Sequence, residues 1–151
     1  MGFEKRLETE LSQLQEDEQK AIKAAMKAVD SAYAPQSNYH VGAALLLENG
    51  EIIMGSNQEN VAYPSGMCAE RSALFAYGSN NRDLKIKILA IMARDKKGVF
   101  SDNCSPCGSC RQVMVEYERL QKTPYKVIFC YNGTFEIASS SSDLMPFPFH
   151  F

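Results

Sequence analysis

Apolar residues recur at helical spacing through the first 33 residues, among many Glu, Gln and Lys. The apolar positions are Leu7, Leu11, Leu14, Ile22, Met26, Val29 and Tyr33. This period is typical of amphipathic helix, either one long helix or two shorter ones. Asp17 and Glu18 are candidates for the start of the second, and Pro35 ends it because the residue before a proline disfavours helical dihedrals.

Further along, apolar runs pair across turn signals. Residues 41–47 and 51–54 flank Asn49-Gly50, and residues 126–131 and 134–138 flank Asn132-Gly133. An Asn-Gly pair between two such runs is the strongest local signal for a β-hairpin. The sequence therefore predicts two antiparallel hairpins, the second of them with no helix between its strands.

Between these hairpins the pattern changes from helix to strand and back. Residues 68–77 have helical spacing before Gly78, which we expect to end the helix. Residues 86–93 predict a buried strand, and a second helix follows the proline at 106 and runs through Tyr117. Residues 139–143 predict a short serine-rich loop. These elements indicate an α/β domain with a mixed five-stranded sheet.

Composition narrows the class of protein. The chain has 151 residues with 45% hydrophobic content, which suits one domain with one core. The net charge of -2 gives no sign of a surface made for nucleic acid, and a small neutral substrate suits it better. No apolar stretch has the length of a signal peptide or a membrane span, so we expect no membrane partner. Five cysteines, an odd number, favour reduced, metal-binding thiols in the cytoplasm over a disulfide framework.

Two short segments carry the candidate chemistry, residues 68–70 (Cys-Ala-Glu) and 106–110 (Pro-Cys-Gly-Ser-Cys). Cys107 and Cys110 are three positions apart, so on a helix opened by the proline both thiols lie on one face of its first turn. The positive end of the helix dipole favours thiolates there. Cys68 would be the third ligand, and zinc with three protein ligands keeps a fourth position for water. The sequence therefore predicts a catalytic zinc site.

Glu70 and Arg71 follow the first of these cysteines. If Cys68 stands at a helix entry, the carboxylate of Glu70 can reach the water at the metal, and we expect it to be catalytic. Three thiolates and one zinc ion carry net negative charge, which weakens the metal as a Lewis acid and calls for positive charge nearby. Arg71 is the candidate for that charge, and Arg111 is a second.

Cys104 leaves two structural alternatives for the cysteines. With the three predicted ligands it would close a four-thiolate structural zinc site. The spacing of Cys104, Cys107 and Cys110 also matches the first three cysteines of the motif that binds an iron–sulfur cluster in bacterial ferredoxins. The fourth cysteine of that motif is expected at position 114, which is Met. The closed zinc site is disfavoured because Cys104 lies before the proline, away from the helix end. We interpret Cys104 and Cys130 as ordinary small thiols.

The spacing of the segments matches the signature of zinc nucleobase deaminases, in which a first ligand, any residue and Glu precede P-C-x-x-C. The chain resembles the small homotetrameric cytidine deaminases from about residue 33 to residue 149. The matching blocks, in order, are 37–46 (SNYHVGAALL), 55–60 (GSNQEN), 63–64 (YP), 68–71 (CAER) and 105–113 (SPCGSCRQV).

The resemblance implies a three-layer α-β-α fold with one zinc ion per chain, held by Cys68, Cys107 and Cys110. It also implies hydrolytic deamination of cytidine and 2′-deoxycytidine in pyrimidine salvage, with Glu70 moving protons between water, ring nitrogen and leaving amine. The resemblance also implies that deaminases of free nucleosides have an antiparallel hairpin as their last two strands. Polynucleotide deaminases insert a helix between those two strands. The nucleoside is the expected partner, with no nucleic acid.

Roles for individual residues also come from the resemblance. It places Asn57 and Glu59 on the ribose hydroxyls, Tyr39 where the family commonly has Phe against the sugar or base, and the backbone amide of Ala69 on the base carbonyl. It makes Arg71 a donor to the ligand sulfurs. In a homotetramer, Phe149 and Tyr63 would reach the site of an adjacent subunit.

Two alternative functions and a boundary between residues 16 and 17 are also expected from the sequence. The close rival is a deaminase of another cytosine nucleoside such as blasticidin S, although Glu59-Asn60 favours a plain ribose. The distant rival is a non-catalytic binding module built on a structural zinc. Residues 1–16 are expected to be a helical extension and residues 17–151 the catalytic domain.

Overall fold

The computed structural model describes residues 2–151, and the side chains of all of these except residues 3 and 4. The helices are α1 (Phe3–Gln13), α2 (Glu16–Ala28), α3 (Ala69–Asn80) and α4 (Gly108–Gln121). The strands are β1 (His40–Leu47), β2 (Ile52–Ser56), β3 (Ile86–Arg94), β4 (Lys126–Tyr131) and β5 (Thr134–Ala138). Short 3₁₀ turns occur at η1 (Val29–Ser31), η2 (Tyr63–Ser65) and η3 (Ser141–Leu144). None of the helices described is long and apolar enough to span a bilayer.

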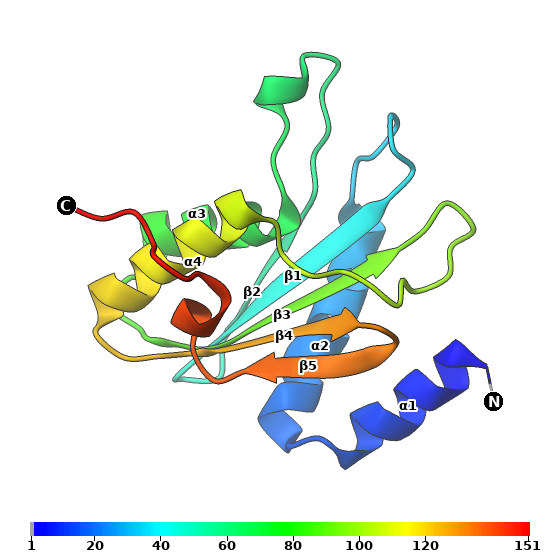
Figure 1. Ribbon diagram of the computed structural model, residues 1–151, viewed down its shortest axis with the longest axis horizontal. Coiled ribbons are helices and arrows are strands. Elements are labelled where there is room, and N and C mark those ends of the chain that lie inside the picture. The colour runs from blue at the N-terminus through cyan, green and yellow to red at the C-terminus, as the bar shows by residue number, and fades with distance from the viewer. Residues whose placement is uncertain (1) are drawn as a thin grey trace.

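The strands form one mixed sheet in the order β2-β1-β3-β4-β5 (Figure 1). β1 is antiparallel to both β2 and β3, β3 is parallel to β4, and β4 is antiparallel to β5. Helix α2 covers one face, while α3 and α4 lie side by side on the other (Figure 1). The three-layer α/β architecture predicted from the sequence is confirmed.

Both predicted hairpins are present, and β4-β5 has the bounds that the sequence pattern indicates. Its turn residues Asn132 and Gly133 both have positive φ, at 49° and 75°. This is the type I′ geometry that matches the right-handed twist of the strands, and Asn and Gly adopt it at low cost. β5 therefore returns directly beside β4, with no helix between them.

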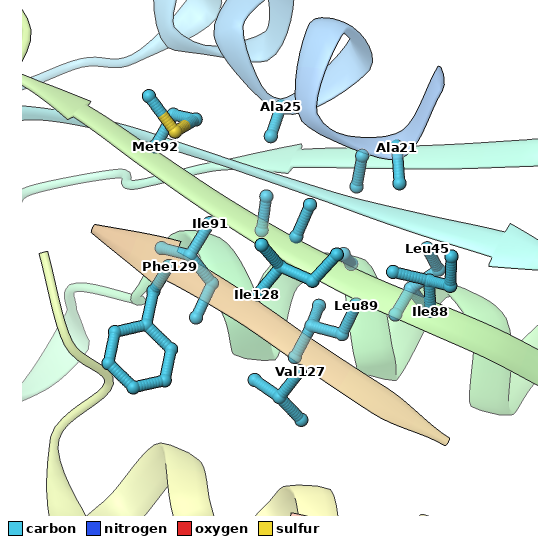
Figure 2. Close-up of a cluster of buried hydrophobic side chains, with 14 of the residues drawn as sticks. Ala21, Ala25, Leu45, Ile88, Leu89, Ile91, Met92, Val127, Ile128 and Phe129 are labelled. Atoms are coloured by element: carbon cyan, nitrogen blue, oxygen red, sulfur yellow. The ribbon is translucent and has the colours of Figure 1, made fainter. Parts of the chain in front are cut away.

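The core lies between the central strands and the helices on both faces. Figure 2 shows Ala21 and Ala25 of α2 pointing toward the sheet, while Phe129 of β4 points away from α2. Small residues let α2 approach closely, because a Cβ added at Gly42 of β1 would lie 2.2 Å from the carbonyl oxygen of Ala25. Close packing of this kind makes the central strands a rigid base for the loops at their ends.

The N-terminal segment forms two helices. α2 starts at Glu16, one residue before the predicted position, where the side chain of Gln15 and that of Glu18 form a capping box. α1 lies beside β5 (Figure 1). Leu7 is buried there, and the Glu10 carboxylate accepts a hydrogen bond of 3.2 Å from the Phe135 backbone N–H.

Two local predictions are wrong. Gly78 does not end α3, which continues to Asn80. The glycine instead makes room for a neighbouring helix, because a Cβ at this position would lie 2.1 Å from the hydroxyl oxygen of Tyr117. The serine-rich segment also includes the turn η3, which is held by the Glu118 side chain as described below.

Candidate active site

Both cysteine segments lie at helix entries. Cys68 is the N-cap residue of α3 and Cys107 is the N-cap residue of α4, each with extended backbone dihedrals. Cys110 lies in the first turn of α4 and is fully buried. α4 begins after the N-cap, so the proline at 106 precedes the helix and does not open it as the sequence predicted. The expected placement of Cys68 at a helix entry is correct.

The three sulfurs converge on one point. The Sγ atoms of Cys68, Cys107 and Cys110 all lie within 4.8 Å of one another, and those of Cys107 and Cys110 are 3.6 Å apart. Sulfurs bound tetrahedrally to one zinc ion at about 2.3 Å lie roughly 3.8 Å from each other. The trio therefore fits a single zinc ion. Cys104 is outside this cluster, and its thiol donates to the Ile91 carbonyl oxygen at 3.4 Å.

Arg71 provides the expected positive charge. Its Nη2 donates to the Cys68 sulfur at 3.2 Å. Its Nε is buried without a hydrogen-bond partner within residues 2–151. A hydrogen bond from Cys110 and then the Arg71 guanidinium lower the pKa of Cys68 to about 5, against the effect of burial. The same contact with Cys68, together with burial, raises the pKa of Cys110. Arg71 thus favours the thiolate form of Cys68, and a divalent cation bound by the three sulfurs would displace the remaining protons.

The Glu70 side chain enters the same space from the first turn of α3. Only 6% of the residue is exposed, and burial raises its pKa above the usual glutamate value, with the nearby Cys68 acting in the same direction. A carboxyl group with a raised pKa exchanges protons more readily near neutral pH. Glu70 therefore has the properties of a general acid and base.

A cavity of about 700 Å³ opens above this cluster. Its floor includes Cys68, Ala69, Glu70, Arg71 and Cys107. Its walls come from the segment before β1, β1 itself, the loop after β2, β3 and the segment before α4. The volume is suitable for a small molecule of a few rings. The cavity is thus a concave site with sulfurs and a buried carboxyl group at its base.

Comparison with known proteins agrees with this geometry. The sequence profile described as "Cytidine and deoxycytidylate deaminase zinc-binding region" matches residues 15–127, about three quarters of the chain. The chain belongs to this deaminase family. The matched region contains both cysteine segments and all of the residues that line the cavity.

Individual members of the deaminase family are also similar. A cytidine deaminase from Halalkalibacterium halodurans is 46% identical over 101 residues, which cover 66% of this chain and 71% of the relative. One from Mycobacterium tuberculosis is 38% identical over 93 residues, covering 62% and 65%. The crystal structure of a cytidine deaminase from Burkholderia pseudomallei superposes with a TM-score of 0.72 at 36% identity, covering 86% of this chain and 97% of that one.

Three residues that the family resemblance places on the sugar or the base line the cavity together. The Asn57 amide bonds to the backbone on both sides, donating to the Tyr39 carbonyl at 2.9 Å and accepting from the Val41 N–H at 2.8 Å. The Tyr39 hydroxyl donates to the Asn103 carbonyl at 2.9 Å. The Glu59 carboxylate accepts from the Gln36 N–H at 2.7 Å. Each side chain is held before any ligand binds.

Tyr63 and Phe149 are placed differently. Tyr63 lines the outer part of the cavity but is 76% exposed, in the arm between β2 and α3 that projects from the body (Figure 1). Phe149 is absent from the lining of the cavity in its own chain. Its backbone N–H and carbonyl instead bond to the Gln112 amide on α4, at 3.0 and 2.9 Å. Phe149 is thus outside the site formed by one chain.

Several contributors to the site were not identified from sequence. Cys104, Ser105, Asn103 and Ile91 line the cavity. Arg111, considered as a second charge for the sulfurs, binds carbonyl oxygens of Pro106 and Leu144 instead. The bond between Arg111 and Leu144 joins positions 33 residues apart, so spacing carried no signal for it. Ser37 also lines the cavity, and its contacts are described below.

Proposed function

We propose that the protein catalyses hydrolytic deamination of cytidine and 2′-deoxycytidine to uridine and 2′-deoxyuridine, with release of ammonia. The observation that carries the proposal is the buried Glu70 carboxyl group beside three converging cysteine sulfurs at the base of a cavity. An acid–base group and a metal-binding trio in one concave site are the elements that hydrolysis of an aromatic amine requires. A closed structural zinc site has no use for either the cavity or the carboxyl group.

The sulfurs of Cys68, Cys107 and Cys110 would hold the zinc ion. When bound, zinc supplies a water molecule activated for attack. Glu70 takes a proton from the attacking water and gives it to the ring nitrogen of the base. It then takes the remaining proton from the hydroxyl group added at C4 and gives it to the amino group, so that the C4 carbonyl forms as the C4–N bond breaks and ammonia leaves. Arg71 keeps Cys68 in the thiolate form, and the Ala69 backbone amide at the N-terminus of α3 is a donor for the base carbonyl.

The cavity favours nucleosides over nucleotides. Arg71 is the only arginine or lysine among the described residues that line it, and its guanidinium is engaged with the Cys68 sulfur. A 5′-phosphate would therefore find no free cation in the site of one chain. Glu59 at the sugar end disfavours a nearby anion further, and it suits a plain ribose better than a bulky aminoacyl sugar such as that of blasticidin S.

The assembly that we propose is a homotetramer whose sites are completed across subunits. The exposed arm around Tyr63 and the aromatic tail support this arrangement, since Phe149 is 69% exposed and lies outside its own cavity. A second copy is the partner that would use both. Light scattering should give about four times 16.8 kDa, and a fully active monomer would contradict the sharing of sites.

A cytoplasmic location and a salvage role follow as proposals from the thiol chemistry and the substrate class, because a site of three reduced cysteines needs a reducing compartment. We also propose that residues 17–151 are the catalytic domain and residues 1–16 an extension. In support of this, the family profile begins at residue 15.

The direct test follows ultraviolet absorbance of purified, zinc-analysed protein with five substrates. These are cytidine, 2′-deoxycytidine, CMP, blasticidin S and adenosine. We expect turnover of the first two only, with one zinc ion per chain. Zinc without turnover of any of them would support the non-catalytic binding module, and faster turnover of blasticidin S than of cytidine would support the close rival.

A further inference from the structure

The Glu59 carboxylate is held at the rim of the cavity by a short stretch of chain just before β1. Its Oε2 accepts from the backbone N–H groups of Gln36 and Ser37, at 2.7 and 3.2 Å. Its Oε1 accepts from the Ser37 hydroxyl. Ser37 itself lines the cavity. The carboxylate on the loop after β2 is therefore oriented by residues more than 20 positions earlier in the chain.

The Ser37 hydroxyl has a second partner. Its Oγ accepts from the Tyr39 N–H at 3.0 Å while it donates to Glu59. A hydroxyl has one proton to donate, and the bond from Tyr39 to the Oγ leaves that proton directed at the carboxylate. The Tyr39 N–H thus orients the Ser37 hydroxyl, and the hydroxyl in turn holds the Oε1 atom of Glu59.

This arrangement leaves part of the carboxylate open. An ionised carboxylate offers about four lone-pair sites. Three are used, and among the described residues Oε1 accepts only from Ser37. Donation from Ser37, followed by the backbone donors, lowers the pKa of Glu59, so the group is a pure acceptor at neutral pH. An acceptor of this kind at the rim suits a hydroxyl donor on the ligand.

We propose that Ser37 is a positioning residue that sets specificity for the sugar, by holding the Glu59 carboxylate so that its open lone pair accepts from a sugar hydroxyl of the nucleoside. The inference rests on the proposed nucleoside deaminase function and adds a residue to it. Ser37 acts through Glu59, so its effect depends on the presence of both that carboxylate and a hydroxyl on the substrate sugar.

A structural role alone for Ser37 makes a different prediction. If the hydroxyl only stabilised the loop before β1, its removal would affect all substrates equally. Ser37→Ala removes the Oγ and leaves both backbone N–H bonds to Glu59 in place. Ser37→Thr retains the hydroxyl and should restore the parent behaviour. Ser79→Ala, on the exposed side of α3, is the matched control for loss of a serine hydroxyl.

The experiment measures kcat and KM of the zinc-loaded enzyme with cytidine and with 2′,3′-dideoxycytidine. For Ser37→Ala we expect KM for cytidine to rise about 3- to 10-fold, comparable to the net loss of one ordinary hydrogen bond, because the two backbone N–H groups still hold Glu59. KM for the dideoxynucleoside should change less than about twofold, and kcat for either substrate should be nearly unchanged. In the Glu59→Gln background, Ser37→Ala should have little further effect on cytidine.

The outcomes separate this inference from the function on which it rests. Equal losses for cytidine and the dideoxynucleoside, or additive effects of Ser37→Ala and Glu59→Gln, would overturn the positioning role while deamination stands. Loss of activity in Ser37→Thr equal to that in Ser37→Ala would overturn it too. A parent enzyme that deaminates neither substrate would overturn the proposed function and this inference together.

Discussion

Cys68 and Cys107 occupy the same position in two different helices, because each is the N-cap residue of the helix that follows it. The helices α3 and α4 lie side by side on one face of the sheet, so their N-termini bring the two thiols together (Figure 1). The positive ends of two helix dipoles meet at this point and favour thiolates. The metal-binding trio is thus a consequence of how the two helices begin.

Replacing Cys110 with serine should abolish both zinc binding and activity. Cys110 is buried in the first turn of α4, and two thiolates with a weakly acidic hydroxyl do not make a stable zinc site. Metal analysis after gel filtration would show well below one zinc ion per chain. Cys130→Ala removes a buried thiol outside the trio and should keep full zinc content. Full occupancy and turnover in Cys110→Ser would contradict the assignment of three ligands.

Gly78→Ala should destabilise the fold by about 1 to 3 kcal/mol, the usual effect of overpacking. The added Cβ would lie 2.1 Å from the hydroxyl oxygen of Tyr117 and 2.9 Å from its ring. Denaturant unfolding of the zinc-loaded protein measures the change. Gly108→Ala is the control, since a Cβ there meets nothing within 4 Å. An unchanged free energy of unfolding in Gly78→Ala would show that the Tyr117 side chain moves aside at little cost.

The carboxylate of Glu118 should make stability depend on pH. It accepts hydrogen bonds from the Ser140 and Ser142 hydroxyls at 2.5 and 2.7 Å and from the Ser141 N–H at 2.8 Å. Burial alone would raise the pKa of Glu118, but these bonds outweigh it and lower the pKa below 4.5. A lowered pKa means that the stabilisation is complete above the pKa of the unfolded chain and is lost as the pH falls through the folded value.

Glu118→Gln tests this dependence. At pH 7 the variant should lose about 1.5 to 3 kcal/mol, typical of hydrogen bonds to a charged group. The difference in free energy of unfolding between parent and variant should shrink as the pH falls below 4.5. Glu116→Gln, an exposed carboxylate on the same helix, should show no such trend. A constant difference from pH 7 to pH 3 would mean that the charge of Glu118 contributes nothing.

The parts of the structure that could be predicted from sequence are those with local causes. The Asn-Gly pairs specify their hairpins because the tight turns need positive φ angles, which Asn132, Gly133 and Gly50 adopt. The cysteine spacing at 107 and 110 predicts that both thiols lie at one helix entry, where Cys107 is the N-cap residue of α4 and Cys110 lies in its first turn. The sequence signature added Cys68 and Glu70 as candidates.

The remaining features depend on contacts between distant residues. The local sequence around Gly78 predicts the end of a helix, but the glycine is instead needed to leave room for Tyr117 on the neighbouring helix. The serine-rich segment reads as a loop, but the buried Glu118 orders it into a turn. Ser37 has no local signal for its contact with Glu59, which is 22 positions away. In each case a tertiary contact overrides or adds to the local preference.

Glu70→Gln should separate metal binding, substrate binding and proton transfer. The substitution retains the size and a hydrogen-bonding side chain but removes the group that carries protons. Zinc should remain at one per chain, because the metal-binding trio consists of the three cysteines. Cytidine should bind with a nearly normal or lower dissociation constant, because Asn57 and Glu59 lie on other elements outside the proton path.

Turnover of this variant should nevertheless collapse. A positioned acid or base typically contributes about 10²- to 10⁴-fold. Glu70 is used at more than one step, so kcat should fall by at least the upper end of that range. Single-turnover kinetics, equilibrium dialysis with cytidine and metal analysis give the three readouts. Loss of zinc would make Glu70 a ligand, and turnover within a factor of about ten of the parent would assign the proton transfers to another group.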